Sequence, residues 1–141
     1  MVTETSFVVR ISELIYQEMV DHIVAGYPDE ACGALGSKDG EVVKHYPTAN
    51  AAEFPDDFSI ISYADLLRIY NDVDEYDGDM IYYHSHPKSE AYPSTRDIEY
   101  AKFGYLFIIF SHQYYPKPPY VRVFSISTDK EIREGKVEIH S

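Results

Sequence analysis

The sequence predicts an α+β fold, in which a mixed β-sheet is flanked by helices. Residues 13–25 and 63–77 repeat apolar side chains with the 3.6-residue period of amphipathic helices. Residues 105–110 are apolar without interruption, which is typical of a strand buried on both faces. Shorter β-prone segments surround these three in no regular alternation, so we expect a mixed sheet of about six to eight strands.

The chain opens with a predicted strand and helix. Residues 7–11 are β-prone, and Ser12 has the side chain of an N-cap. The helix that follows has one apolar face, made by Ile15, Tyr16, Met19, Val20, Ile23 and Val24. Gly26 is the residue type favoured after a helix, so we expect this helix to end at about residue 25.

A hairpin should come next. Residues 30–35 and 41–45 form two β-prone segments, and the Asp-Gly pair in the turn at residues 36–40 favours a tight connection between them. Residues 47–57 are rich in Ala, Asn, Pro and Asp without any period, so we assign them no regular structure.

The second half of the chain alternates between the two element types. Ser62 is the expected N-cap of the second long helix, which should end at Gly78 after an acidic run. After the buried strand at residues 105–110, a proline-rich turn leads to a strand at residues 120–126. Residues 130–139 then predict one last alternating strand.

Length and charge narrow the classes of function. With 141 residues the chain is expected to form a single domain, residues 1–141, around one core. It has 24 acidic and 12 basic residues, a formal net charge of −12, and no cluster of Lys or Arg. Phosphate backbones and anionic membranes should be repelled, so we expect neither nucleic acid nor a membrane as partner.

The sequence also predicts a cytoplasmic protein. No apolar run approaches the roughly 18–20 residues that span a bilayer, and residues 1–6 lack the features of a signal peptide. The single cysteine, Cys32, allows no internal disulfide, which agrees with a reducing compartment.

The side chains with most potential chemistry lie in residues 80–100. Residues 80–83 are β-prone and Pro87 should stop the strand, which places His84 and His86 at its end. Side chains repeat their direction every second residue, so both imidazoles project from one face, with their Cα atoms about 6–7 Å apart. Two histidines so placed can share one metal ion, although such pairs more often lie on the surface or in the core without one.

A helix start follows the two histidines. Ser94 is a typical N-cap and Asp97 its partner at the third helical position, a capping box that explains both residues without any metal. Combined with the histidines, however, Asp97 supplies a third N/O donor. Three donors from two rigid elements leave one tetrahedral position for water, which is the layout of a catalytic zinc site.

Such a site also needs a proton acceptor, and Glu30 is the candidate. It stands at the start of a predicted strand, beside Ala31, Gly33 and Ala34, which are small enough to let a substrate come near. The alternative is a solvent-exposed glutamate at a helix–strand junction, which is the usual state of Glu in proteins.

Taken together, these residues resemble a known motif. Glu30, the His-Ser-His-Pro run at residues 84–87 and the Ser-x-x-Asp run at residues 94–97 have the spacing of the JAMM motif of MPN-domain zinc metalloproteases. The chain is most similar to the small bacterial Mec-type peptidases, which act on ubiquitin-like sulfur-carrier proteins. The resemblance implies the MPN (JAB1/MPN-like, cytidine-deaminase-like) fold.

The same resemblance implies a role for each residue. His84, His86 and Asp97 bind Zn²⁺. Glu30 takes a proton from water, and Ser94 helps to hold the oxyanion. The implied reaction hydrolyses the amide bond after the C-terminal Gly-Gly of a ubiquitin-like sulfur-carrier protein and releases an appended amino acid such as cysteine. Whether the bond is a peptide or an isopeptide, and whether the protein is a homodimer, stays open.

Other classes of function remain as alternatives. A catalytically silent MPN scaffold would only bind partner proteins, but such relatives usually lack a motif residue. A general zinc peptidase would accept any unfolded C-terminus. A zinc deaminase needs a His-x-Glu and a later Pro-Cys-x-x-Cys, and this chain has one cysteine. A cysteine hydrolase would need a base beside Cys32, which we expect to be a buried, small apolar residue.

Overall fold

The computed structural model describes residues 7–100 and 105–141, and within them eight strands and three helices. In chain order these are β1 (Val8–Ser12), α1 (Glu13–Gly26), β2 (Cys32–Lys38), β3 (Glu41–Thr48), α2 (Tyr63–Glu75), β4 (Asp79–His86), α3 (Thr95–Tyr100), β5 (Tyr105–Ser111), β6 (Tyr120–Ile126), β7 (Ile132–Glu134) and β8 (Lys136–His140). The predicted α+β class is confirmed. In the described part of the chain, no helix has the length and apolar character needed to cross a bilayer.

All eight strands form one mixed sheet. Its strand order is β7-β6-β5-β4-β2-β3-β1-β8, and β4 runs parallel to β5 while β1 runs parallel to β3 and β8. The other neighbours are antiparallel. The apolar run predicted to be an interior strand is β5, which pairs with β4 on one side and β6 on the other.

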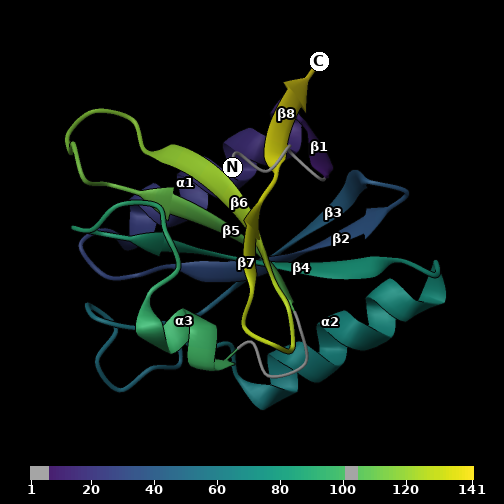
Figure 1. Ribbon diagram of the computed structural model, residues 1–141, viewed down its shortest axis with the longest axis horizontal. Helices are drawn as coiled ribbons and strands as arrows, with labels where there is room; N and C mark the ends of the chain where they lie inside the picture. Colours follow the sequence, from purple (N-terminus) through teal and green to yellow (C-terminus); the bar gives the residue numbers. More distant parts are fainter. Residues whose placement is uncertain (1–6, 101–104) are drawn as a thin grey trace.

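The helices cover opposite faces of the sheet: α1 lies on one side and α2 and α3 on the other (Figure 1). The side chains of β4 alternate between these two layers, as the period of a strand requires. Ile81 and Tyr83 belong to the apolar core under α1, with Met19 and Ile23 of that helix. Tyr82 packs in a separate cluster on the other face, which is the face that carries the candidate site.

Both long helices begin where the sequence predicts. The hydroxyl of Ser12 accepts a hydrogen bond from the backbone N–H of Ile15, and that of Ser62 accepts one from Asp65, each at 3.2 Å. The second helix ends at Glu75 rather than Gly78, because Asp77 adopts a φ of 54°, in the left-handed region that ends a helix.

The hairpin is tighter and its strands longer than the sequence predicts. Only Asp39 and Gly40 form the turn, both with positive φ, which suits the right-handed twist of the flanking strands. At the far end, β3 continues to Thr48, in the segment to which we assigned no structure. The reason is pairing that local sequence does not reveal, since Thr48 lies opposite Cys32 of β2.

One prediction is wrong: residues 130–139 do not form a single strand. Gly135 divides the segment, so that β7 pairs with β6 at one edge of the sheet while β8 pairs with β1 at the other. The N–H of Gly135 donates to the carbonyl of Val123, and the next N–H donates to that of Phe7, each at 3.0 Å. The two edges of the sheet therefore meet at this glycine.

Candidate metal centre

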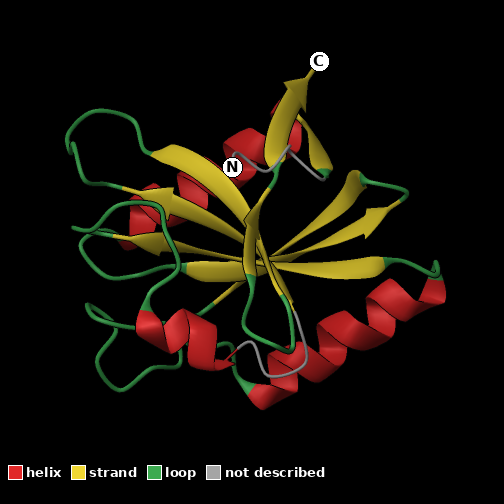
Figure 2. Ribbon diagram, in the orientation of Figure 1, coloured by secondary structure: helices red, strands yellow, loops and turns green. Residues whose placement is uncertain are grey.

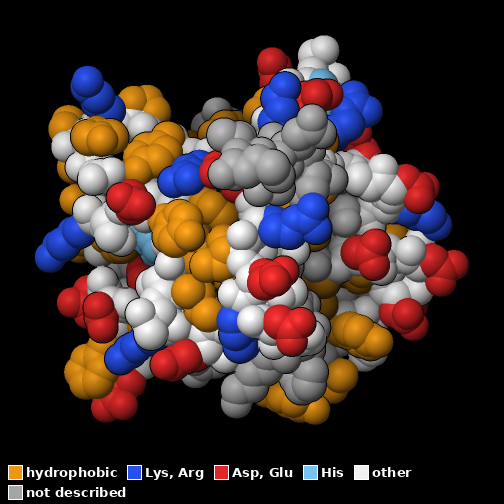
Figure 3. Space-filling view, in the orientation of Figure 1, with side chains coloured by type: hydrophobic (Ala, Val, Ile, Leu, Met, Phe, Trp, Pro, Cys, Tyr) orange, Lys and Arg blue, Asp and Glu red, His pale blue; other side chains and the backbone are white. Residues whose placement is uncertain are grey.

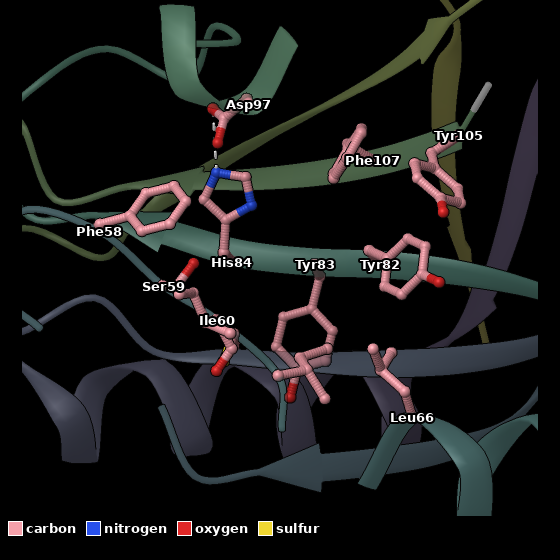
Figure 4. A pocket seen from close by; sticks show the side chains of 12 residues that line it. Phe58, Ser59, Ile60, Leu66, Tyr82, Tyr83, His84, Asp97, Tyr105 and Phe107 are labelled. Atoms are coloured by element: carbon pink, nitrogen blue, oxygen red, sulfur yellow. Dashed lines mark hydrogen bonds and ion pairs between the residues drawn. The ribbon is translucent and has the colours of Figure 1, made fainter. Parts of the chain in front are cut away.

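β4 and α3 bring the three predicted ligands together. His84 and His86 project from one face of β4. Asp97 reaches His84 from the first turn of α3 (Figure 4). The two Nε2 atoms are 3.1 Å apart, and Oδ2 of Asp97 lies 3.2 Å from Nε2 of His84 and 3.3 Å from Nε2 of His86. All three side chains are buried, so the donor atoms form a compact triangle shielded from solvent.

This triangle fits a zinc ion. Zinc–nitrogen and zinc–oxygen bonds are about 2.0–2.2 Å long, and tetrahedral geometry then separates ligand atoms by about 3.3–3.6 Å. Nδ1 of His86 donates a hydrogen bond to the carbonyl of Glu90 at 2.8 Å. In the neutral ring, that bond leaves the lone pair of Nε2 directed at the other two donors, as metal-binding histidines require.

The electrostatics of Asp97 also suit a ligand. Burial opposes ionisation of this carboxyl, but the neighbouring imidazoles of His84 and His86 outweigh it and hold the pKa of Asp97 well below its usual range. The N–H of Ser94 donates to Oδ2 at 2.8 Å and acts in the same direction. The carboxylate is therefore kept ionised, which is the form that binds a metal.

Ser94 forms the predicted capping box. Its hydroxyl accepts a hydrogen bond from the N–H of Asp97 at 3.1 Å, while its own N–H donates to the aspartate side chain. A hydroxyl has two lone pairs and one hydrogen, so accepting a bond for the cap leaves the hydrogen free to serve a second partner. Capping and oxyanion binding do not exclude each other, and the oxyanion role stays a prediction.

Glu30 is not the exposed glutamate of the alternative interpretation. It lies just before β2 and is 9% exposed. Burial raises the pKa of its carboxyl, although the charges of His84 and His86 and a hydrogen bond from Ser59 pull the pKa back down. The carboxylate is buried, its pKa is raised, and it interacts electrostatically with the metal-binding cluster. These are the properties of a general base.

Comparison with known proteins assigns the chain to a family. Residues 12–127 match the model of the prokaryotic homologues of the JAB domain. The chain belongs to this family. It is 33% identical over 100 residues to the CysO-cysteine peptidases of Mycobacterium tuberculosis and Mycobacterium bovis, an alignment that covers 69% of this chain and 68% of each relative.

Solved structures agree with the JAB assignment. A solution structure of a Desulfitobacterium hafniense protein has a TM-score of 0.81 and 27% identity, and the match covers 94% of this chain and 93% of that one. A JAB1/MPN domain protein from Archaeoglobus fulgidus has a TM-score of 0.55 at 16% identity, over 94% and 97% of the two chains. A structure described as the JAMM metalloprotease-like zinc site in the proteasome and signalosome has a TM-score of 0.53 at 16% identity, over 95% and 99%. The predicted MPN fold is confirmed.

Cys32 of this JAB-domain chain is buried, as predicted. It is 2% exposed, and its Sγ lies 3.5 Å from the hydroxyl of Thr48. Burial raises the pKa of the thiol, which disfavours the reactive thiolate. Ser85 lies between the two histidines on β4, so its side chain projects from the opposite face, where its hydroxyl accepts a hydrogen bond from the N–H of Ala31. These features disfavour a cysteine hydrolase.

Asn50, which with Ala49 resembles the family's loop asparagine near the site, lies in the loop between β3 and α2. Its amide Nδ2 donates to the carbonyls of Glu30 and Phe58, each at 2.9 Å. Its Oδ1 accepts from the N–H groups of Ala52 and Ile60, each at 3.0 Å. One side chain therefore ties the candidate base to the loop that carries Ser59.

A pocket also opens beside the ligands (Figure 4). The long loop that contributes to it lies between β3 and α2 (Figure 2). It has a volume of about 170 Å³ and reaches from His84 and Asp97 into apolar surroundings. Its walls include Phe58, Ile60, Leu66, Tyr82, Tyr105 and Phe107. The position of Tyr82 follows from the alternation that aligns the histidines, since it precedes His84 by two residues, but the contributions of the loop and α2 depend on tertiary packing.

Proposed function

We propose that this JAB-family chain is a zinc-dependent peptidase that hydrolyses the amide bond after the C-terminal Gly-Gly of a ubiquitin-like sulfur-carrier protein. The observation that carries the proposal is the donor triangle of His84, His86 and Asp97, whose spacing of 3.1–3.3 Å suits one zinc ion. The substrate class is supported by the similarity to the CysO-cysteine peptidases, whose name states an action on a CysO–cysteine adduct.

Each residue has a distinct task in this proposal. When bound, zinc would polarise the scissile carbonyl and lower the pKa of a coordinated water. Glu30 would accept the proton of the attacking water and pass it to the leaving amine. Ser94 would donate its hydroxyl hydrogen to the oxygen that gains negative charge, while its lone pairs continue to cap α3.

The surface charge should affect the rate at which a carrier protein associates. The net charge is −12, and acidic and basic side chains are interspersed on the visible face (Figure 3). A carrier with a basic patch would be attracted, at a rate that falls as salt rises. We place this activity in the cytoplasm, because the chain has one cysteine and needs no oxidising compartment for its fold.

Metal content is the first test. Purified protein should contain about one zinc per chain, and the His84→Ala/His86→Ala variant should contain almost none. His140→Ala is a matched control, because that histidine lies on β8 and pairs with Glu41. Full zinc content in the double variant would show that these histidines are not the ligands.

Substrate choice is the second test. A ubiquitin-like carrier extended by one residue after Gly-Gly should be cleaved with higher kcat/KM than a free peptide with the same last residues, as measured by mass spectrometry. Equal efficiency on both would indicate a general zinc peptidase. A zinc-loaded protein that cleaves neither, nor an isopeptide-linked adduct, would support the scaffold alternative.

A further inference from the structure

The pocket beside the candidate ligands is polar at one end only. Asp97 and His84 stand at the polar end, while Tyr82, Tyr105 and Phe107 gather at the other (Figure 4). The rings of Tyr82 and Tyr105 meet edge to face with centroids 4.9 Å apart. The far end therefore presents mainly aromatic carbon, which suits an uncharged side chain.

The pocket is larger than the side chain of cysteine. Its volume is about 170 Å³. An apolar cavity of about 150 Å³ in another protein accommodates benzene, so this space suits a side chain such as Leu, Met or Phe. A cysteine side chain, with only a methylene and a thiol, would leave much of the wall without a contact partner and would forfeit dispersion energy.

The proposed substrate determines which of its residues can place a side chain in this pocket. Both residues on the acyl side of the scissile bond are glycines, which have no side chain to place in it. The residue released by hydrolysis is then the one beside the bond that carries a side chain. An acidic side chain would have to leave its charge against the apolar and aromatic walls of the pocket, which is costly.

We propose that this pocket binds the side chain of the released residue and selects an uncharged, apolar side chain larger than cysteine. The inference rests on the proposed function, because it takes the Gly-Gly tail as the acyl part. One extra or missing methylene in a fitted apolar pocket changes kcat/KM by about 10–200-fold. We therefore expect adducts ending in Leu, Met or Phe to be cleaved at least about tenfold better than those ending in Ala, Cys or Asp.

The test uses the zinc-loaded protein and a set of ubiquitin-like carriers, each extended after Gly-Gly by Ala, Cys, Asp, Leu, Met or Phe. Mass spectrometry gives kcat/KM for each. Leu66→Phe narrows the pocket from α2 and should reduce the ratio of kcat/KM for the Leu adduct over the Ala adduct by about tenfold. Ile60→Phe narrows it from the loop and guards against misfolding of one variant.

Leu67→Phe is the matched control, because Leu67 is the next residue of α2 and is 50% exposed. It should leave the ratio unchanged. Equal cleavage of all adducts, a preference for Cys or Ala, or a ratio insensitive to both pocket variants would overturn the inference while leaving the peptidase proposal intact.

A binding measurement separates failure of the inference from failure of the proposed function. Free L-leucine and L-phenylalanine should give saturation-transfer NMR signals that weaken in Leu66→Phe, while L-aspartate gives none. If no adduct is cleaved but these signals appear, the peptidase proposal fails and the pocket's preference stands. Absence of the signals together with absence of cleavage overturns both.

Discussion

At the scale of single residues, Glu30 is the side chain on which turnover should depend most. Its amide isostere keeps the shape and cannot accept a proton, so Glu30→Gln should retain zinc and fold but lose about 10²–10⁴-fold in kcat. Rates on a carrier adduct, zinc content and circular dichroism together test this. If Glu30→Gln hydrolyses the adduct at the unmodified rate, another group is the base.

The pH dependence should depend on Ser59. Its hydrogen bond to Glu30 lowers a pKa that burial raises, so Ser59→Ala should raise the pKa of Glu30 further. Because a base acts only when deprotonated, activity rises with pH through this pKa, and the acid limb of the kcat/KM profile should move to higher pH. Thr128→Ala, which removes an exposed hydroxyl in the turn after β6, should leave the limb in place. If Ser59→Ala leaves the acid limb at the same pH, the limb does not report the ionisation of Glu30.

The sequence predicts the position of a site residue where that position is set by residues close to it in the chain. The alternation of a strand is enough to align His84 with His86, and a capping box places Asp97 in the first turn of its helix. The burial of Glu30 was not predictable in this way. It depends on a loop some twenty residues away in the sequence, which closes over the glutamate through Asn50.

At the scale of elements, the loop between β3 and α2 should depend on Asn50. Asn50→Ala removes hydrogen bonds that join this loop to itself and to the segment of Glu30. Leaving such groups unpaired costs about 1–3 kcal/mol each where they stay buried, so the loop should open. We expect lower kcat and faster proteolysis within residues 51–61, both measurable on the purified variant.

Asn71→Ala, at an exposed position of α2, is the control for the loop variant. It should change neither kcat nor the rate of proteolysis within residues 51–61. Wild-type proteolysis and turnover in Asn50→Ala would mean that the loop is held by its other contacts.

The bounds of an element were predictable where residues at its own ends determine them. They were less predictable where pairing with another strand determines them. Ser12 and Ser62 indicated the starts of both long helices, because an N-cap side chain bonds to backbone groups in the first turn of its helix. The extension of β3 to Thr48 has no such signal, because Pro47 and Thr48 are held in the sheet by Gly33 and Cys32 of the neighbouring strand. Long-range pairing of this kind overrides local propensity.

At the scale of the whole molecule, the sheet closes on itself through its last strands. We expected one strand over residues 130–139 because apolar and charged residues alternate there. Nothing in that pattern reveals that its halves pair with opposite edges, since the partners are β6 and β1, at opposite ends of the described chain. Gly135, near the middle of the segment, was the one sign of a break.

The closure predicts a large effect for a small substitution at this glycine. A Cβ at Gly135 would collide with the ring of Phe7, and its backbone does not lie in the left-handed region, so the penalty is steric. Overpacking of this kind typically costs about 1–3 kcal/mol. Gly135→Ala should therefore lower the free energy of unfolding by that amount in denaturant titrations. Lys136→Ala, at the exposed neighbouring position, should change it by less than about 0.5 kcal/mol.

A double-mutant cycle identifies the collision as the cause. If the Phe7 ring is what the new methyl group meets, Gly135→Ala should cost much less in a Phe7→Ala background, with a coupling energy of about 0.5–3 kcal/mol. Strict additivity of the two substitutions would mean that the ring and the glycine do not interact. The meeting of the two sheet edges would then depend on the backbone hydrogen bonds of Gly135 and Lys136 alone.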